Sequence, residues 1–185
     1  MGAVRNVGKA EAPLPIVMRT FSPLLDISSV LPVLSEIAIF GGFQEHELHG
    51  ILKYLEESVF KKGEAVFQRG DDPTHIYIVK KGKIDLLIDA KEVRVKKKTL
   101  VAGDCFGEAS LMAMHPHTAT AIAVEESEVM VFSRQALMQL QKQDSKLFSL
   151  LMMNIARELA RRLELTDEIL LHYITTHGDV QPKIV

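Results

Sequence analysis

The chain has little cysteine, no long apolar run and almost no net charge. Its single cysteine, Cys105, excludes an internal disulfide and reads as a small buried side chain rather than a reactive thiolate. No run of about eighteen apolar residues is present, and the first residues lack the apolar core of a signal peptide. We therefore expect no membrane span and a cytoplasmic location.

The charge is nearly balanced, with 22 basic and 24 acidic side chains and a formal net charge of −2. No overall field steers such a chain toward nucleic acid or an anionic membrane. A local basic cluster comprises Lys91, Arg94, Lys96, Lys97 and Lys98, near Lys80, Lys81 and Lys83. It could bind an anionic partner, but the alternation of charged residues with Val93 and Val95 is more typical of a strand with a solvated outer face.

The hydrophobic fraction of 47% in 185 residues is enough for one ordinary domain with a sizeable core. Residues 1–24 contain three prolines and no sustained period, so we interpret them as a flexible leader without an assigned fold. A helical period begins at Asp26 and stops at a glycine pair, and a second helix is predicted over Gln44–Leu55.

The hydrophobic period changes to two between Val59 and Phe132, and glycines interrupt it at near-regular intervals. Short strands are predicted around residues 66–67, 76–79, 84–88, 93–95, 119–123 and 129–132. Many short strands with glycine turns are typical of a closed antiparallel barrel or roll. The predicted fold class is mainly β with flanking helices, and the β-roll with its short helices is assigned to residues 25–144.

A long helix is predicted over residues 145–173, followed by a tail at 174–185. Leucine or isoleucine recurs every four residues, at Leu151, Ile155, Leu159 and Leu163. Such a helix could pack along its own barrel, but one flank of the barrel is too short to cover all of it. We therefore favour pairing with a second copy of the chain, which makes a homodimer.

Residues 106–120 read FGEASLMAMHPHTAT and form the most specific motif of the chain. A glycine turn that leads into a short helix presents unpaired backbone N–H groups and a partial positive charge, so it can bind a phosphate. In the alternative interpretation, Gly107 and Glu108 only cap that helix, where a carboxylate in the first turn is favourable.

The motif resembles the phosphate-binding cassette of cyclic-nucleotide-binding domains, and the strand pattern around it is similar to the jelly roll of that family, which includes bacterial catabolite-activator-like regulators. The resemblance covers about Ile37–Tyr173 and implies cAMP or cGMP as ligand. It also implies that Glu108 accepts a ribose hydroxyl, that the amides of Ala109 and Ser110 face the phosphate, and that Thr120 lies beside the base and phosphate. The predicted ligand-binding residues are Phe106, Gly107, Glu108, Ala109, Ser110, Leu111, His117, Thr118 and Thr120.

His117 stands where the family pattern has arginine. Arginine offers a permanently charged fork to two phosphate oxygens, whereas imidazole, with a pKa near about 6.5, is mostly neutral at pH 7. A charge-assisted contact is worth about 1.5 to 3 kcal/mol, so we expect binding weakened by about tenfold to more than a hundredfold unless another cation compensates. A nearby phosphate would raise the histidine pKa, which predicts tighter binding below about pH 6.5.

Two classes of function remain. One is a regulatory module that senses a cyclic nucleotide or a related small ligand and moves the helices of a dimer. The other is a ligand-free scaffold for dimerisation or for a downstream protein partner. We expect no DNA binding, because only about a dozen residues follow Tyr173, too few for a helix-turn-helix.

No catalytic motif is present, so we read the protein as a non-enzyme without a cofactor. His115 and His117 flank Pro116 at a spacing that could bring both rings near one metal ion. A solvated loop is the simpler interpretation because no further ligand stands at a firm spacing, and no metal site is predicted.

Overall fold

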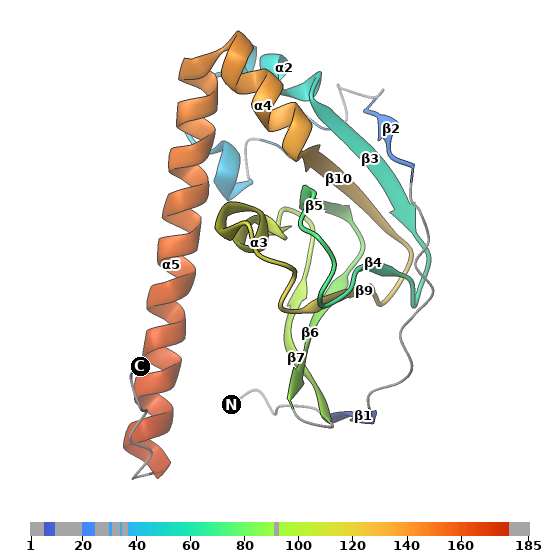
Figure 1. The fold of residues 1–185 in the computed structure, drawn as a ribbon, viewed down its shortest axis with the longest axis vertical. Coiled ribbons are helices and arrows are strands. Elements are labelled where there is room, and N and C mark those ends of the chain that lie inside the picture. The colour runs from blue at the N-terminus through green and yellow to red at the C-terminus, as the bar shows by residue number, and fades with distance from the viewer. Residues whose placement is uncertain are drawn as a thin grey trace.

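The computed structural model describes residues 6–9, 20–24, 30, 34, 37–90 and 93–177. Two five-stranded antiparallel sheets form a roll, and helices pack along one flank (Figure 1). The expected mainly-β fold with a long C-terminal helix is therefore confirmed. The strands are β1 (Asn6–Lys9), β2 (Ser22–Pro23), β3 (Leu55–Phe60), β4 (Ala65–Phe67), β5 (His75–Lys81), β6 (Ile84–Ala90), β7 (Val93–Leu100), β8 (Cys105–Phe106), β9 (Thr120–Ala123) and β10 (Ser127–Ser133).

The helical elements are η1 (Ala38–Phe40), α2 (Glu45–Leu52), α3 (Glu108–Ala113), α4 (Arg134–Gln143) and α5 (Ser145–His177). One sheet has the order β1-β7-β6-β9-β4 and the other β2-β3-β10-β5-β8. Among the described residues, no helix is both long and apolar enough to span a membrane.

Strands β10 and β5, which are neighbours in the second sheet, are buried on both faces. In β5, Ile76 and Ile78 belong to the core shared with the helices, whereas Tyr77 and Val79 belong to the core inside the roll. Strand β10 divides its side chains between the same two cores. Because successive side chains of a strand point to opposite faces, this sheet separates the roll interior from the helices.

Helix α5 is packed on the roll near its start and exposed near its end. Leu147, Leu151 and Ile155 are buried in the core beneath the helices. The Asn154 amide Nδ2 donates to the carbonyl oxygens of Ile39 at 3.2 Å and Gly41 at 2.7 Å, which fastens α5 to η1. The helix continues beside α3 and beyond it (Figure 1), and it ends at His177 rather than at the predicted residue 173.

Several boundaries differ from the sequence-based expectations. Helix α2 ends at Leu52, because Leu55 begins β3 and pairs with Phe132 of β10. The leader, to which we assigned no fold, contributes β1, which pairs with β7, and β2, which pairs with β3. Most of the first predicted helix lies outside the described residues, as do residues 178–185 of the predicted tail.

Candidate functional site

The cassette begins at Gly107, between β8 and α3. Gly107 has φ 82°, in the left-handed region that favours glycine. A Cβ atom at this position would lie 2.8 Å from Cδ2 of Tyr77, which is closer than side chains normally approach. Glycine is therefore required here both by the backbone conformation and by the ring beside it, and it allows α3 to start directly above β5.

Seven of the nine predicted ligand-binding residues line one small cavity of about 120 Å³; these are Phe106, Gly107, Glu108, Ala109, Ser110, His117 and Thr118. The other two do not line it. Leu111 is buried in the core beneath the helices, and the Thr120 hydroxyl accepts a hydrogen bond from the Arg69 amide at 3.1 Å. Residues that sequence analysis did not predict complete the lining, namely Phe67, Leu86, Lys97, Ala119 and Arg162.

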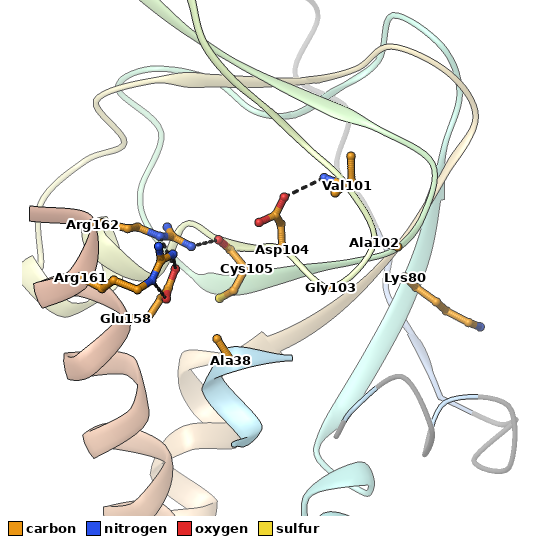
Figure 2. A pocket seen from close by; sticks show the side chains of 10 residues that line it. All are labelled: Ala38, Lys80, Val101, Ala102, Gly103, Asp104, Cys105, Glu158, Arg161 and Arg162. Carbon is orange, nitrogen blue, oxygen red and sulfur yellow. Dashed lines mark hydrogen bonds and ion pairs between the residues drawn. The ribbon is translucent and has the colours of Figure 1, made fainter. Parts of the chain in front are cut away.

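The Glu108 carboxylate is held by α5. Its side chain is only 1% exposed, and its Oε1 accepts a hydrogen bond from Arg162 Nη1 at 2.6 Å. The same guanidinium donates from Nη2 to the Cys105 carbonyl at 2.6 Å and from Nε to Glu158 at 2.7 Å. Figure 2 shows Arg161 and Arg162 converging on Glu158, with Arg162 also reaching Cys105. One arginine thus connects α5, α3 and β8.

Arg162 also borders a second, larger cavity of about 520 Å³, whose lining includes Cys105, Glu158 and Arg161 (Figure 2). Burial raises the pKa of Glu108, and the Arg162 guanidinium acts in the opposite direction. Hydrogen bonds, led by the one from Arg161, lower the pKa of Glu158. Burial also raises the pKa of Cys105 well above its ordinary value. The predicted buried, unreactive thiol is consistent with this placement.

His117 occupies an environment that the sequence did not indicate. Its ring is 3% exposed and stacks on Phe67, with centroids 3.7 Å apart and an interplanar angle of 8°. Within the described part of the chain, its buried Nε2 atom has no hydrogen-bond partner. Burial lowers its pKa. Burial therefore favours the neutral form of the ring, and protonation to contact a phosphate becomes more costly than for a free histidine.

His115 and His117, the two side chains that could have shared a metal ion, lie in different environments. His115 is exposed, whereas His117 is buried against Phe67. In the described ranges, no group of three or more His, Cys, Asp or Glu side chains is placed to hold a metal ion.

The basic cluster on β7 lies on a strand whose charged side chains are mostly paired. Arg94 contacts Asp89 at 3.0 Å, Lys96 contacts Asp85 at 3.4 Å, and Lys98 contacts Asp104 at 2.8 Å. These contacts favour the interpretation of a strand with a solvated, charged face. Lys97 differs, because it lines the cassette cavity.

Sequence reasoning missed Arg162 and Lys97 as candidate site residues. Arg162 was visible only as one of several charges on the polar faces of a long helix, 54 residues away from Glu108 along the chain. Lys97 was named only as a member of the basic cluster, which we interpreted as the solvated face of a strand. Neither pattern indicates which side chain turns toward the cassette.

Comparisons with known proteins agree with the resemblance. The family model described as the cyclic nucleotide-binding domain matches residues 57–144. The chain is 30% identical over 132 residues to the cyclic AMP receptor protein of Thermus thermophilus, which covers 70% of this chain and 58% of that protein. It is 33% identical over 84 residues to a cAMP-dependent protein kinase regulatory subunit of Eremothecium gossypii, covering 45% of this chain and 18% of that protein. The chain thus spans less than two thirds of these relatives.

Solved structures show the same fold. A cyclic nucleotide-binding domain from Methylobacillus flagellatus superposes with a TM-score of 0.72 at 20% identity, over 85% of this chain and 86% of that one. The catabolite activator protein of Thermus thermophilus superposes with a TM-score of 0.66 at 29% identity, over 72% of this chain and 61% of that one. The jelly-roll prediction is confirmed by these superpositions.

Proposed function

We propose that this chain, in which residues 57–144 form a domain of the cyclic nucleotide-binding family, is a non-catalytic regulatory module whose cassette binds cAMP or cGMP. The observation that carries the proposal is the convergence of seven predicted residues on one cavity beside α5. The relatives named as a cyclic AMP receptor protein and a cAMP-dependent kinase regulatory subunit support a regulatory role.

Glu108 keeps capacity for a ribose hydroxyl. A carboxylate offers about four lone-pair positions on its two oxygens. Arg162 uses Oε1, whereas the partner of Oε2 is the Cys105 thiol at 3.7 Å, which is a weak donor. The first-turn amides of Ala109 and Ser110 have no acceptor inside the helix and would face the phosphate. These groups together match a ribose and a cyclic phosphate.

Ligand entry would be coupled to α5. The cavity of about 120 Å³ is smaller than the roughly 300 to 1,000 Å³ of typical ligand sites. A nucleotide must therefore displace lining side chains, and Arg162 is the one that connects the cavity to α5. Ligand binding would shift the position of this helix, which is the output we propose for the module.

The exposed end of α5 would carry this output to a second copy of the chain. Its large apolar side chains are exposed beyond the point where the helix leaves the core, including Leu163 at 62%, Ile169 at 63% and Leu171 at 61%. A helix of 33 residues whose last turns expose this many large apolar side chains is typical of a helix that packs against another protein surface. We therefore propose a homodimer through α5.

The alternative function is a ligand-free dimerisation or interaction scaffold. Two observations favour it: His117 is buried, which lowers its pKa, and the cavity is small. In this case α5 and its exposed apolar side chains would be the functional part, and the cassette would only help to hold α5 in place.

Titration calorimetry with cAMP and cGMP at pH 7.5 and 5.5 tests the proposal, with 5′-AMP as the non-cyclic control. Saturable binding of a cyclic nucleotide, together with a ligand-dependent change in the sedimentation of the dimer, is the expected result. If neither nucleotide binds at either pH while the protein remains dimeric, the scaffold function is correct instead.

A further inference from the structure

Lys97 sits at an irregularity in the pairing of β6 with β7. Leu86 pairs with Lys98 and the next residue, Leu87, pairs with Lys96, so Lys97 has no partner in the register. This is a β-bulge, in which one strand contains an extra residue and a side chain is redirected. The result is that Lys97 lines the cassette cavity together with Leu86, which lies on the neighbouring strand.

The lysines on either side of Lys97 form ion pairs with aspartates. Lys96 forms an ion pair with Asp85 at 3.4 Å, and Lys98 forms one with Asp104 at 2.8 Å. For Lys97, no acidic partner lies within ion-pair distance among the described residues, and its side chain is exposed at the cavity. The bulge therefore singles out one of three consecutive lysines.

The charges around the cavity also single out Lys97. Glu108 and Glu158 carry two negative charges, and Arg161 and Arg162, which bind them, carry two positive charges. This network is neutral as it stands. His117 adds no charge at neutral pH because its ring is buried. Of the two cationic side chains that line the cavity, Arg162 is paired with glutamates. Lys97 has no acidic partner within ion-pair distance among the described residues, so its charge is available to a bound anion.

We propose that the Lys97 ammonium binds the cyclic phosphate from β7 and supplies the charge that the cassette lacks at position 117. This inference rests on the proposed function, since it assigns the phosphate contact of the same site. An ammonium carries three donors on a flexible stem, so it can reach a phosphate oxygen without the fixed geometry of a guanidinium. The site would then recognise the anion through the charge of a strand residue together with the backbone amides of the cassette.

The experiment compares Lys97→Gln with the matched variants Lys96→Gln and Lys98→Gln. Each variant is titrated with cAMP, cGMP and the nucleosides adenosine and guanosine, which lack the phosphate. We expect Lys97→Gln to weaken cyclic nucleotide binding by about tenfold to a hundredfold and to leave nucleoside binding unchanged. The two control variants change cyclic nucleotide binding by less than about threefold, because neither side chain lines the cavity and each is paired with an aspartate.

Lys97→Arg and His117→Arg sharpen the test. Lys97→Arg keeps the positive charge and retains binding within about threefold of wild type. In a His117→Arg background, Lys97→Gln has a smaller effect, since a second cation shares the phosphate. Thermal unfolding of each variant confirms that an exposed lysine was changed without loss of the fold.

The outcomes separate the two proposals. Binding by wild type that is unchanged in Lys97→Gln overturns this inference and leaves the proposed function standing. An equal loss of cyclic nucleotide and nucleoside binding in Lys97→Gln also overturns it, because the lysine then acts on the shape of the site. If wild type binds neither cyclic nucleotide, the proposed function is wrong and this inference with it.

Discussion

The cassette lies between two unlike environments. On the side of β4 and β5 it rests on aromatic rings, where Phe67, Tyr77 and Phe106 lie with centroids 5.2 to 5.9 Å apart. On the side of α5 it meets charges, where Glu108 binds Arg162 and Arg162 binds Glu158. The aromatic side holds the cassette by packing, which needs no particular partner. The charged side depends on one arginine of α5, so removing that side chain leaves the buried Glu108 carboxylate without its cation.

The largest effect is expected on the charged side. Arg162→Leu leaves the buried Glu108 carboxylate without its cation, and we expect a loss of about 2 to 4 kcal/mol of unfolding free energy. This loss of unfolding free energy is slightly smaller than for a fully buried ion pair, because the Arg162 side chain is 29% exposed. Urea denaturation at pH 7.5 measures it.

The matched control is Arg161→Leu. This side chain is 62% exposed and contacts only Glu158 among the acidic groups within ion-pair distance in the described ranges. We expect it to cost less than about 1 kcal/mol. Equal losses in the two variants would show that the contact with Glu108 is not what stabilises the charged side.

The aromatic side is tested by Gly107→Ala. A Cβ atom here adds strain at φ 82° and displaces the Tyr77 ring, which together cost about 2 to 3 kcal/mol. Gly103→Ala is the control, since Gly103 has φ 90° and no atom within 4 Å of an added Cβ. It should lose only the strain, about 1 kcal/mol. A loss as large in Gly103→Ala would mean that the Tyr77 contact is unimportant.

A smaller effect, of opposite sign, is expected for His117→Phe. The substitution preserves the stack on Phe67 and removes the unpaired Nε2 atom, which should raise the unfolding free energy by about 1 kcal/mol at pH 7.5. Because burial lowers the His117 pKa, the unfolded chain takes up the proton first as the pH falls below about 6.5. Wild type therefore loses stability there, and the advantage of the variant grows.

Denaturation of both proteins at pH 7.5, 6.5 and 5.5 gives this difference. His75, whose pKa is also lowered by burial, is present in both proteins and its contribution cancels. His115→Gln, at an exposed position, serves as the control. A constant difference between His117→Phe and wild type across these pH values would contradict the assignment.

The last effect is on the chemical reactivity of Cys105, which lies where the aromatic and charged sides meet. Its carbonyl accepts from Arg162 and its buried thiol lies against Glu108. Because burial raises the thiol pKa well above its ordinary value, alkylation by iodoacetamide at pH 8 should be about a hundredfold slower in the native protein than in urea. Arg162→Leu should accelerate it, whereas Arg161→Leu should not. Native labelling at the unfolded rate would show that the thiol is accessible.

Much of the fold could be predicted because it depends on local sequence patterns. The apolar runs in β5 and β10 and the four-residue repeat in α5 are properties of consecutive residues. The C-terminal end of α2 could not be predicted, because Leu55 is equally compatible with a helix and a strand. Its pairing with Phe132, far along the chain, decides between them.

For the candidate site, the cassette residues could be proposed from sequence but their surroundings could not. The stack of His117 on Phe67 and the contact of Arg162 with Glu108 join residues 50 or more positions apart, so no local pattern reports them. The redirection of Lys97 depends on a register shift between two strands, which the alternation of valine and lysine conceals.

The fastening of Asn154 to η1 determines how α5 can move. Two hydrogen bonds, to Ile39 and Gly41, oppose sliding of the helix along the roll. They leave tilting about that point as the easier motion. At about 1.5 Å per residue, Tyr173 lies roughly 28 Å from this pivot, so a tilt of about 10° would carry it by about 5 Å. If α5 tilts in this way, a displacement of Arg162, roughly 12 Å from the pivot, becomes one about twice as large at Tyr173.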